Sequence, residues 1–150
     1  MVLNSMNISV RKVGKLLSYL GLVPFLMAAV VVLIFNIPVS VVAPVFIIYS
    51  ALILSFMSGA LWGMSFIFDE RKDCIQLVSV MYPLIAWGLI LWGNMLLTLV
   101  CLSLSYIHLW WFEKRLFAHA QIGVQYQQMR LLLTTLVVLS HLAVIFYSLL

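Results

Sequence analysis

The fold is decided by an uncharged stretch, Cys74–Phe112, which reads CIQLVSVMYPLIAWGLILWGNMLLTLVCLSLSYIHLWWF. As one helix this stretch would extend about 58 Å, which is twice the ~30 Å hydrocarbon core of a bilayer. We therefore predict two membrane-crossing helices that fold back on one another. The break is expected at Trp92-Gly93-Asn94, because Gly and Asn tolerate the left-handed backbone that ends a helix.

The composition of the whole chain agrees with a membrane protein. Of its 150 residues 66% are hydrophobic and only 8% are charged, whereas soluble globular chains have roughly 45–50% apolar and about 25% charged residues. Too few charged groups are present to cover a soluble surface, so lipid must surround most of the chain. This excludes a secreted disulfide scaffold, a disordered tail and a nucleic-acid binder, and the net charge of +4 reflects scarce acids.

Three further apolar stretches complete the predicted topology. Pro44 suits the first turn of a helix, where its missing N–H costs nothing, so the second span is started there and 38–43 is assigned to a turn. We predict a single all-α membrane domain over residues 1–150, a bundle of five transmembrane helices. The predicted spans are 16–37, 44–68, 74–92, 95–112 and 131–150.

The cationic residues orient this bundle. All 8 Lys and Arg residues fall in segments 1–15, 69–73 and 113–130, and cytoplasmic loops are the ones that collect such residues. The N-terminus is therefore expected in the cytoplasm and the C-terminus outside. The first apolar run is too long for a cleaved signal peptide. We expect a bacterial cytoplasmic (inner) membrane, with the mitochondrial inner membrane as the alternative because its proteins carry a similar basic flank.

Segment 113–130 has two interpretations. One is a helix that lies in the cytoplasmic interface, since apolar residues recur on one side of it and glutamines on another. The other is a plain polar loop. The apolar positions are Ala118, Ile122, Tyr126 and Met129, and the glutamines are Gln121, Gln125 and Gln128.

A stripe of small residues marks the second span. Ser55, Gly59 and Gly63 recur at every fourth position, with Ser58 and Trp62 beside them. Small residues let two helix backbones approach closely in lipid, where no hydrophobic force drives association. The first interpretation is packing within the bundle, and the alternatives are a dimer interface or the wall of a small pocket.

His141 is the ionisable side chain that this topology places near the bilayer midplane. Such residues are costly in lipid and face a partner or a water-filled cavity. The hydroxyls expected at a similar depth are those of Ser55, Ser58, Tyr82 and Ser103. A neutral imidazole bonded to a hydroxyl is the favoured interpretation, and a proton or solute relay is the alternative.

Two prolines interrupt predicted spans. Pro24 and Pro83 each remove a helical N–H, and the carbonyl freed one turn earlier then needs a neighbour such as Ser, Tyr or water. We expect kinks at both positions, either static or serving as a gating hinge.

Charged residues gather at the expected cytoplasmic face. Ion pairing is the expected arrangement there, because acids and bases occur together. The cluster shows no fixed spacing of metal ligands, so no metal site is predicted. Its principal members are Asp69, Glu70, Glu113 and Arg130.

Several segments resemble those of the family catalogued as domain of unknown function 3429 (DUF3429), which comprises small membrane proteins with about five spans. The most specific is the second-span motif Gly59-Ala-Leu-Trp-Gly63. The chain departs from the family pattern at Ser58, where the family tends to have Gly, at Leu61, where it tends to have His, and at Gln125, where it tends to have an aromatic residue. The resemblance implies the five-span topology and no particular reaction. The other matching segments are Gly21-Leu-Val-Pro-Phe25, Tyr49, Ile53-Leu-Ser-Phe56, Tyr82-Pro83, Trp87, Tyr126 and Arg130-Leu-Leu-Leu-Thr134.

No nucleophile–base pair, phosphate-binding glycine loop or pair of catalytic carboxylates is visible, so we predict neither an enzyme nor a cofactor. The function hypothesis is a non-enzymatic accessory protein that supports the cell envelope or a membrane complex, with a membrane-protein partner or a second copy bound through the second span. The alternative is a small permease or proton-coupled carrier that uses His141. A minor alternative is the binding of a lipid or quinone between Trp62, Trp87 and Tyr82.

Overall fold

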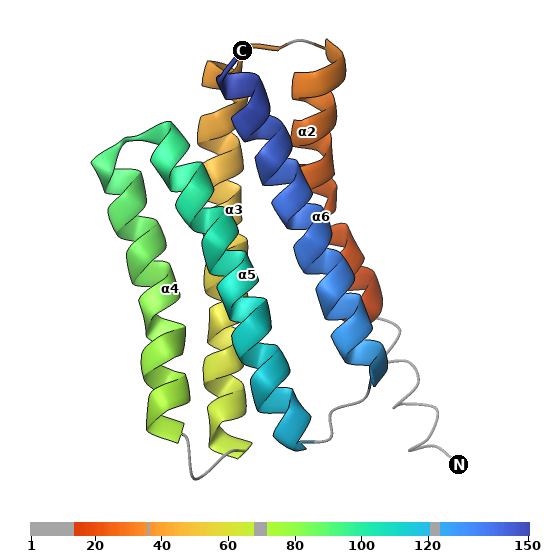
Figure 1. Ribbon diagram of the computed structural model, residues 1–150, viewed down its shortest axis with the longest axis vertical. Helices are drawn as coiled ribbons and strands as arrows, with labels where there is room; N and C mark the ends of the chain where they lie inside the picture. Colours follow the sequence, from red (N-terminus) through yellow and green to blue (C-terminus); the bar gives the residue numbers. More distant parts are fainter. Residues whose placement is uncertain (1–13, 36, 68–71, 121–123) are drawn as a thin grey trace.

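The computed structural model describes residues 14–35, 37–67, 72–120 and 124–150, and this part of the chain is helical with no strand (Figure 1). A helical stretch at 14–20 and a turn at 21–22 precede the first full helix. Five stretches are long and apolar enough to cross a membrane, which confirms the predicted fold class. The elements are α2 (Val23–Phe35), α3 (Val39–Met64), the short 3-10 helix η1 (Ser65–Ile67), α4 (Lys72–Trp92), α5 (Met95–Ala120) and α6 (Val124–Ser148).

The decisive hairpin is formed where the sequence predicts it. Helix α4 ends at Trp92, and Gly93 adopts a φ of 74°, the left-handed conformation that a residue with a Cβ rarely adopts. The Oδ1 of Asn94 then accepts a hydrogen bond of 2.9 Å from the backbone N–H of Leu97. The Gly-Asn pair therefore ends one helix and caps the next.

The second span begins earlier than predicted. Helix α3 starts at Val39 with Pro38 at its N-cap, and Pro44 lies inside the helix rather than at its start. The added first turn is stabilised by packing, since the exposed fractions of Val39 and Ala43 are 8% and 0%. Burial of these residues outweighs the one backbone hydrogen bond that Pro44 cannot donate.

The fourth and fifth spans also extend beyond their predicted ends. Segment 113–130 is neither a separate interfacial helix nor a loop in the described residues: α5 continues to Ala120 and α6 begins at Val124. Residues 121–123 lie outside the description. The fourth span was predicted to end just before Glu113 and the fifth to begin just after Arg130. These two side chains neutralise one another inside the bundle and so do not force the helices to end.

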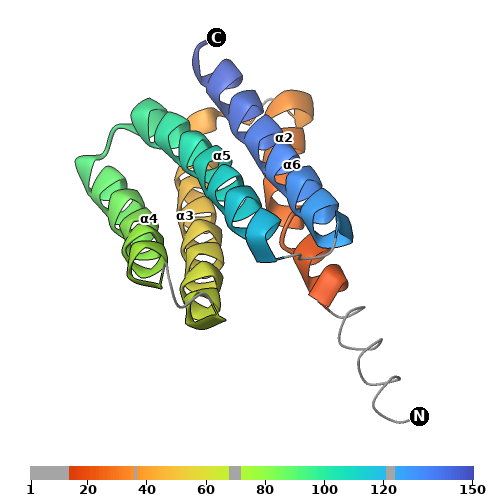
Figure 2. The same cartoon turned by 60° about the horizontal axis from the view of Figure 1, so that its bottom comes forward.

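The bundle is organised around α3 and α6. Helix α4 packs on α3, whereas α6 packs on α5 and α2, and both views show α4 and α2 on opposite sides of the molecule (Figure 1, Figure 2). Few contacts join α3 to α6 directly.

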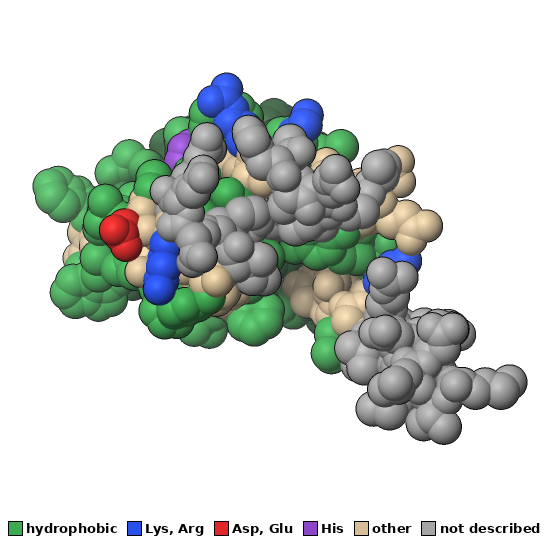
Figure 3. Space-filling view, turned by 90° about the horizontal axis from the view of Figure 1, so that it is seen from below, with side chains coloured by type: hydrophobic (Ala, Val, Ile, Leu, Met, Phe, Trp, Pro, Cys, Tyr) green, Lys and Arg blue, Asp and Glu red, His purple; other side chains and the backbone are tan. Residues whose placement is uncertain are grey.

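The two ends of the bundle differ in charge. Stretch 14–20, the start of α4 and the junction of α5 and α6 lie at the lower end in Figure 1, and the C-terminus lies at the upper end. Lysine and arginine side chains are visible at the lower end in Figure 3. The described cations all belong to this end or to the first two turns of helix above it: Lys15, Lys72, Lys114, Arg115 and Arg130.

Candidate functional site

A buried ion pair joins α5 to α6 near the cationic end. Glu113 and Arg130 are only 2% and 7% exposed. The Nη2 of Arg130 donates to Oε1 of Glu113 over 2.9 Å, and Nε donates to Oε2. This two-pronged geometry matches the fixed fork of the guanidinium to both carboxylate oxygens. The sequence predicts these two residues in an ion-pair cluster, but its other members, Asp69 and Glu70, lie outside the described residues.

The same guanidinium also reaches α3. Its Nη1 lies 3.3 Å from the sulfur of Met57, and a thioether is a weak acceptor. Two of the three guanidinium nitrogens therefore bond to a carboxylate, while the third has only a weak partner among the bonds described. The N–H groups on Nη1 retain capacity for an acceptor oxygen.

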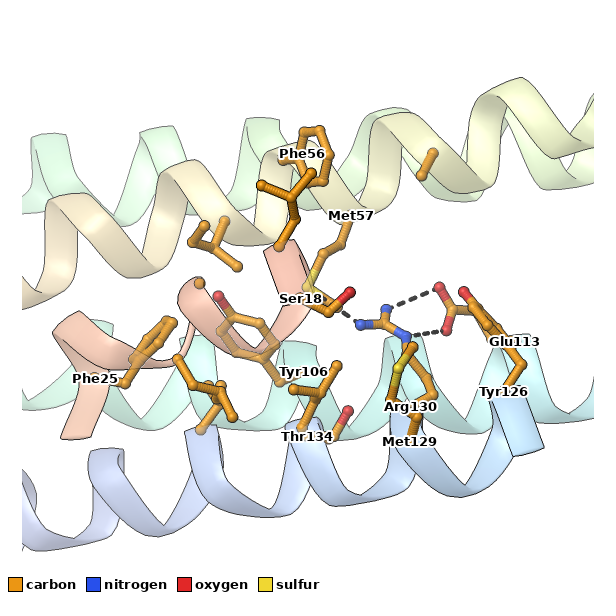
Figure 4. Close-up of a pocket in the computed structure, with 17 residues that line it drawn as sticks. Ser18, Phe25, Phe56, Met57, Tyr106, Glu113, Tyr126, Met129, Arg130 and Thr134 are labelled. Carbon is orange, nitrogen blue, oxygen red and sulfur yellow. Dashed lines mark hydrogen bonds and ion pairs between the residues drawn. The ribbon is translucent and has the colours of Figure 1, made fainter. Parts of the chain in front are cut away.

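A cavity of about 200 Å³ opens beside this pair, between residues 17–25, α3, α5 and α6 (Figure 4). Its walls are mostly apolar, with Phe25, Ile53 and Leu133 among them, and the ion pair lies at one end. Thr134 also lines the cavity. Its hydroxyl is buried and has no hydrogen-bond partner among the described residues.

His141 lies in a closed part of the interior, behind Phe25 and Tyr106, which also line the cavity. Its side chain is 0% exposed, and it contacts the rings of Phe25, Phe46 and Tyr106, with 4.7 Å between the Phe46 and His141 ring centroids. Its Nδ1 lies 2.9 Å from the carbonyl oxygen of Val137. Since a carbonyl can only accept, Nδ1 carries a hydrogen.

The other imidazole nitrogen bonds to a serine of α3. Nε2 of His141 lies 2.9 Å from Oγ of Ser50, and a neutral ring accepts a hydrogen bond at this position. The hydroxyl of Tyr106 donates to the carbonyl of the same serine over 2.8 Å. His141 therefore has a hydroxyl partner, which is Ser50 and not one of the predicted hydroxyls.

The predicted midplane site is not assembled. The hydroxyl of Ser55 donates to the carbonyl of Ala51 and that of Ser103 to the carbonyl of Leu99. Tyr82 bonds through its hydroxyl to Nδ1 of His108 over 2.8 Å. Serine hydroxyls in helices often bond back to a carbonyl one turn earlier, and such local bonds satisfy these serines without a hydrogen bond to His141.

The small-residue stripe faces away from the bundle. A Cβ added at Gly59 or Gly63 would meet no atom within 4 Å, so the interpretation of these glycines as packing within the bundle is wrong. Ser58 is buried instead, on the side of α3 that includes the buried Leu54 and Leu61. The stripe and this packed side are different faces of one helix. Trp62 is 43% exposed and packs edge-on against Phe66.

The first span turns at residues 21–22, close to Pro24. The hydroxyl of Tyr49 donates to the carbonyl of Gly21 over 2.9 Å, which replaces a bond lost where the first span turns at 21–22. Pro24 itself is the second residue of α2, a position that tolerates proline. Pro83 lies within α4, which continues to Trp92. The hinge hypothesis stays a prediction at both sites.

The aromatic pocket predicted from Trp62, Trp87 and Tyr82 has no support in these contacts. Trp87 is 63% exposed, Trp62 contacts Phe66, and Tyr82 contacts His108. The cavity lies elsewhere. No site was predicted to include Ser50, Met57 or Thr134. Of the three, Ser50 alone could have been identified from the sequence, because it lies midway along the second span once that span is started at Val39.

Comparison with known proteins gives one match. A family model described as "Protein of unknown function (DUF3429)" matches residues 10–146. No curated protein and no solved structure matches the chain.

Proposed function

We propose a function on the premise that this chain belongs to the DUF3429 family, a family of unknown function. The proposal is a non-enzymatic accessory protein of a membrane, which binds another membrane-spanning helix and supports a membrane complex or the cell envelope. The partner is either a different protein or a second copy of this chain. The cations at one end support an orientation with that end in the cytoplasm, in the inner membrane of a bacterium.

The outer face of α3 carries this proposal. Gly59 and Gly63 leave open space where side chains would stand, so another helix can bring its backbone close to α3 at this stripe. Such close approach is a main source of helix association in lipid. Lipid tails are as apolar as the side chains, so moving side chains out of lipid gains no hydrophobic free energy. The exposed rings of Phe56 and Trp62 flank the glycines and add contact area on either side.

The test enlarges the glycines. We expect Gly59→Leu and Gly63→Leu to reduce crosslinked dimer, or the recovery of a co-purified partner, at least fivefold in native membranes, because the added side chains hold the backbones apart. Gly88→Leu on α4 is the matched control, since Gly88 is also helical and has open space around it. The control should leave association unchanged.

Two results contradict the proposal. One is that native membranes yield only monomer without a partner. The other is that Gly59→Leu and Gly88→Leu affect association equally. Thermal unfolding of each variant in mild detergent separates loss of association from loss of fold.

The carrier alternative is less well supported. A proton or solute pathway through His141 needs water at the imidazole. The ring is instead enclosed by aromatic side chains, and both of its nitrogens have partners within the bundle. His141 is also not among the residues that line the cavity beside Arg130.

A further inference from the structure

We propose that the cavity between residues 17–25, α3, α5 and α6 binds a neutral lipophilic molecule through a carbonyl oxygen. The carbonyl accepts hydrogen bonds from Arg130 and Thr134, and the apolar body of the molecule fills the remainder of the cavity. Quinones and acyl esters share this chemistry. Phe56 of α3 adjoins both this cavity and the outer face that contains Gly59 and Gly63, but the hydrogen-bond donors of the cavity come from α6, so the two proposals are tested by different variants.

Unused hydrogen-bonding capacity is the first argument. A guanidinium has five N–H donors. Glu113 accepts from the N–H on Nε and from one N–H on Nη2, while Nη1 has only the sulfur of Met57 at 3.3 Å. Thr134 is only 6% exposed, and its buried hydroxyl has no partner in the described chain. A threonine in a helix can bond back to the carbonyl one turn earlier, and Thr134 does not do so. Both groups line the same cavity.

Charge selects the class of ligand. Among the described residues, the charged ones that line the cavity are Glu113 and Arg130, and they neutralise one another through two hydrogen bonds. An anionic head group would meet the Glu113 carboxylate at close range, where the low dielectric strengthens repulsion. A cation would find the carboxylate oxygens already occupied by Arg130. A neutral acceptor fits the remaining donors.

Size and lining select an apolar body. A cavity of about 150 Å³ lined by apolar side chains accommodates benzene, so the 200 Å³ observed here is sufficient for one substituted ring or a short length of acyl chain. Phe25, Phe56 and Met129 are among the apolar wall residues (Figure 4). The cavity is not closed off, so a tail can continue from it into the bilayer.

The experiment measures binding to the full-length protein in nanodiscs of an ether-linked phosphatidylcholine, which has no ester carbonyl to compete for the site. Three probes are added separately: a short-chain benzoquinone, dioctanoylglycerol, and the anionic dioctanoyl phosphatidylglycerol. Binding is followed by the midpoint of thermal unfolding as a function of probe concentration, because a ligand that binds the folded state raises this midpoint. We expect saturable stabilisation by a neutral probe.

Two neighbouring threonines provide a matched pair of variants. Thr134→Val removes the hydroxyl in the cavity at nearly constant volume, and the apparent affinity for the neutral probe should fall about tenfold. Thr135→Val is the control, because Thr135 is exposed and its hydroxyl donates to the carbonyl of Leu131. The control should leave affinity unchanged. A second variant, Ile53→Phe, fills the cavity and should abolish stabilisation while the protein remains folded.

Each outcome decides the matter. Stabilisation by the quinone alone identifies a quinone site, by the glycerol ester alone a lipid site, and by both a site for the shared carbonyl. The proposal is overturned if neither neutral probe stabilises the protein, if Thr134→Val and Thr135→Val behave alike, or if the anionic probe binds more tightly than both neutral ones.

Discussion

The Arg130 side chain stabilises the bundle only together with Glu113. Two charges taken out of water cost several kcal/mol each, and their attraction repays this only when the geometry is good. Here the two residues are almost fully buried and joined by two hydrogen bonds. Removing one partner leaves an uncompensated charge, whereas removing both leaves an apolar contact between α5 and α6.

This asymmetry gives a prediction for three variants. We expect Arg130→Met to lower the free energy of unfolding by about 3–5 kcal/mol, measured by denaturant titration in mild detergent. The double variant Arg130→Met/Glu113→Leu should recover most of this loss. Lys114→Met is the control, since Lys114 is exposed beside the Trp110 ring, and it should change stability by less than about 0.5 kcal/mol. A double variant as unstable as the single one would contradict the argument.

Residue types indicated these sites only in part. An ion pair that includes Glu113 and Arg130 follows from the gathering of acids and bases at one face of the bundle, and a hydroxyl partner for His141 follows from the cost of an ionisable group in lipid. The identity of Ser50 depends on where α3 begins, and the unpartnered Thr134 hydroxyl depends on the path of neighbouring helices. The spacing of residues within one helix encodes neither the start of α3 nor the path of its neighbours.

At the level of elements, charge failed to mark a helix end where two opposite charges are buried as a pair. Lys72 lies next to the predicted start of the third span, and α4 begins at Lys72. Glu113 and Arg130 were also expected to lie in a loop at the ends of spans, but both lie within helices. The side chains of Glu113 and Arg130 pair with one another between two helices, so they can be buried in the bundle with no net charge.

The continuation of α5 beyond Phe112 can be measured. We expect the backbone amides of residues 113–116 to exchange with deuterium at least a hundredfold more slowly than an unstructured segment, because they are hydrogen-bonded within a helix that is buried at Glu113 and Leu116. Mass spectrometry of proteolytic peptides from the nanodisc-embedded protein gives these rates. Exchange of this segment within seconds would restore the loop interpretation.

At the level of the whole molecule, the number of spans was accessible from the sequence because it depends on length and hydrophobicity alone. Once a stretch exceeds the bilayer thickness twofold, it must fold back, and Gly93 is the residue that allows the turn. The cavity was not accessible in this way. Its wall residues come from segments as far apart as Phe25, Ile53 and Leu133, which are brought together only by the tertiary packing of the helices.

The orientation of the bundle is the prediction that belongs to this scale. Lys and Arg are held back on the cytoplasmic side during insertion, and every described cation lies toward the lower end of the molecule in Figure 1. We expect an epitope tag after Leu150 to be accessible to an impermeant label on spheroplasts, and a tag before Met1 to become accessible only after permeabilisation. Each tagged protein serves as the control for the other. Labelling of the N-terminal tag on sealed spheroplasts, with the C-terminal tag protected, would reverse the orientation and place Arg130 and its cavity toward the outer leaflet.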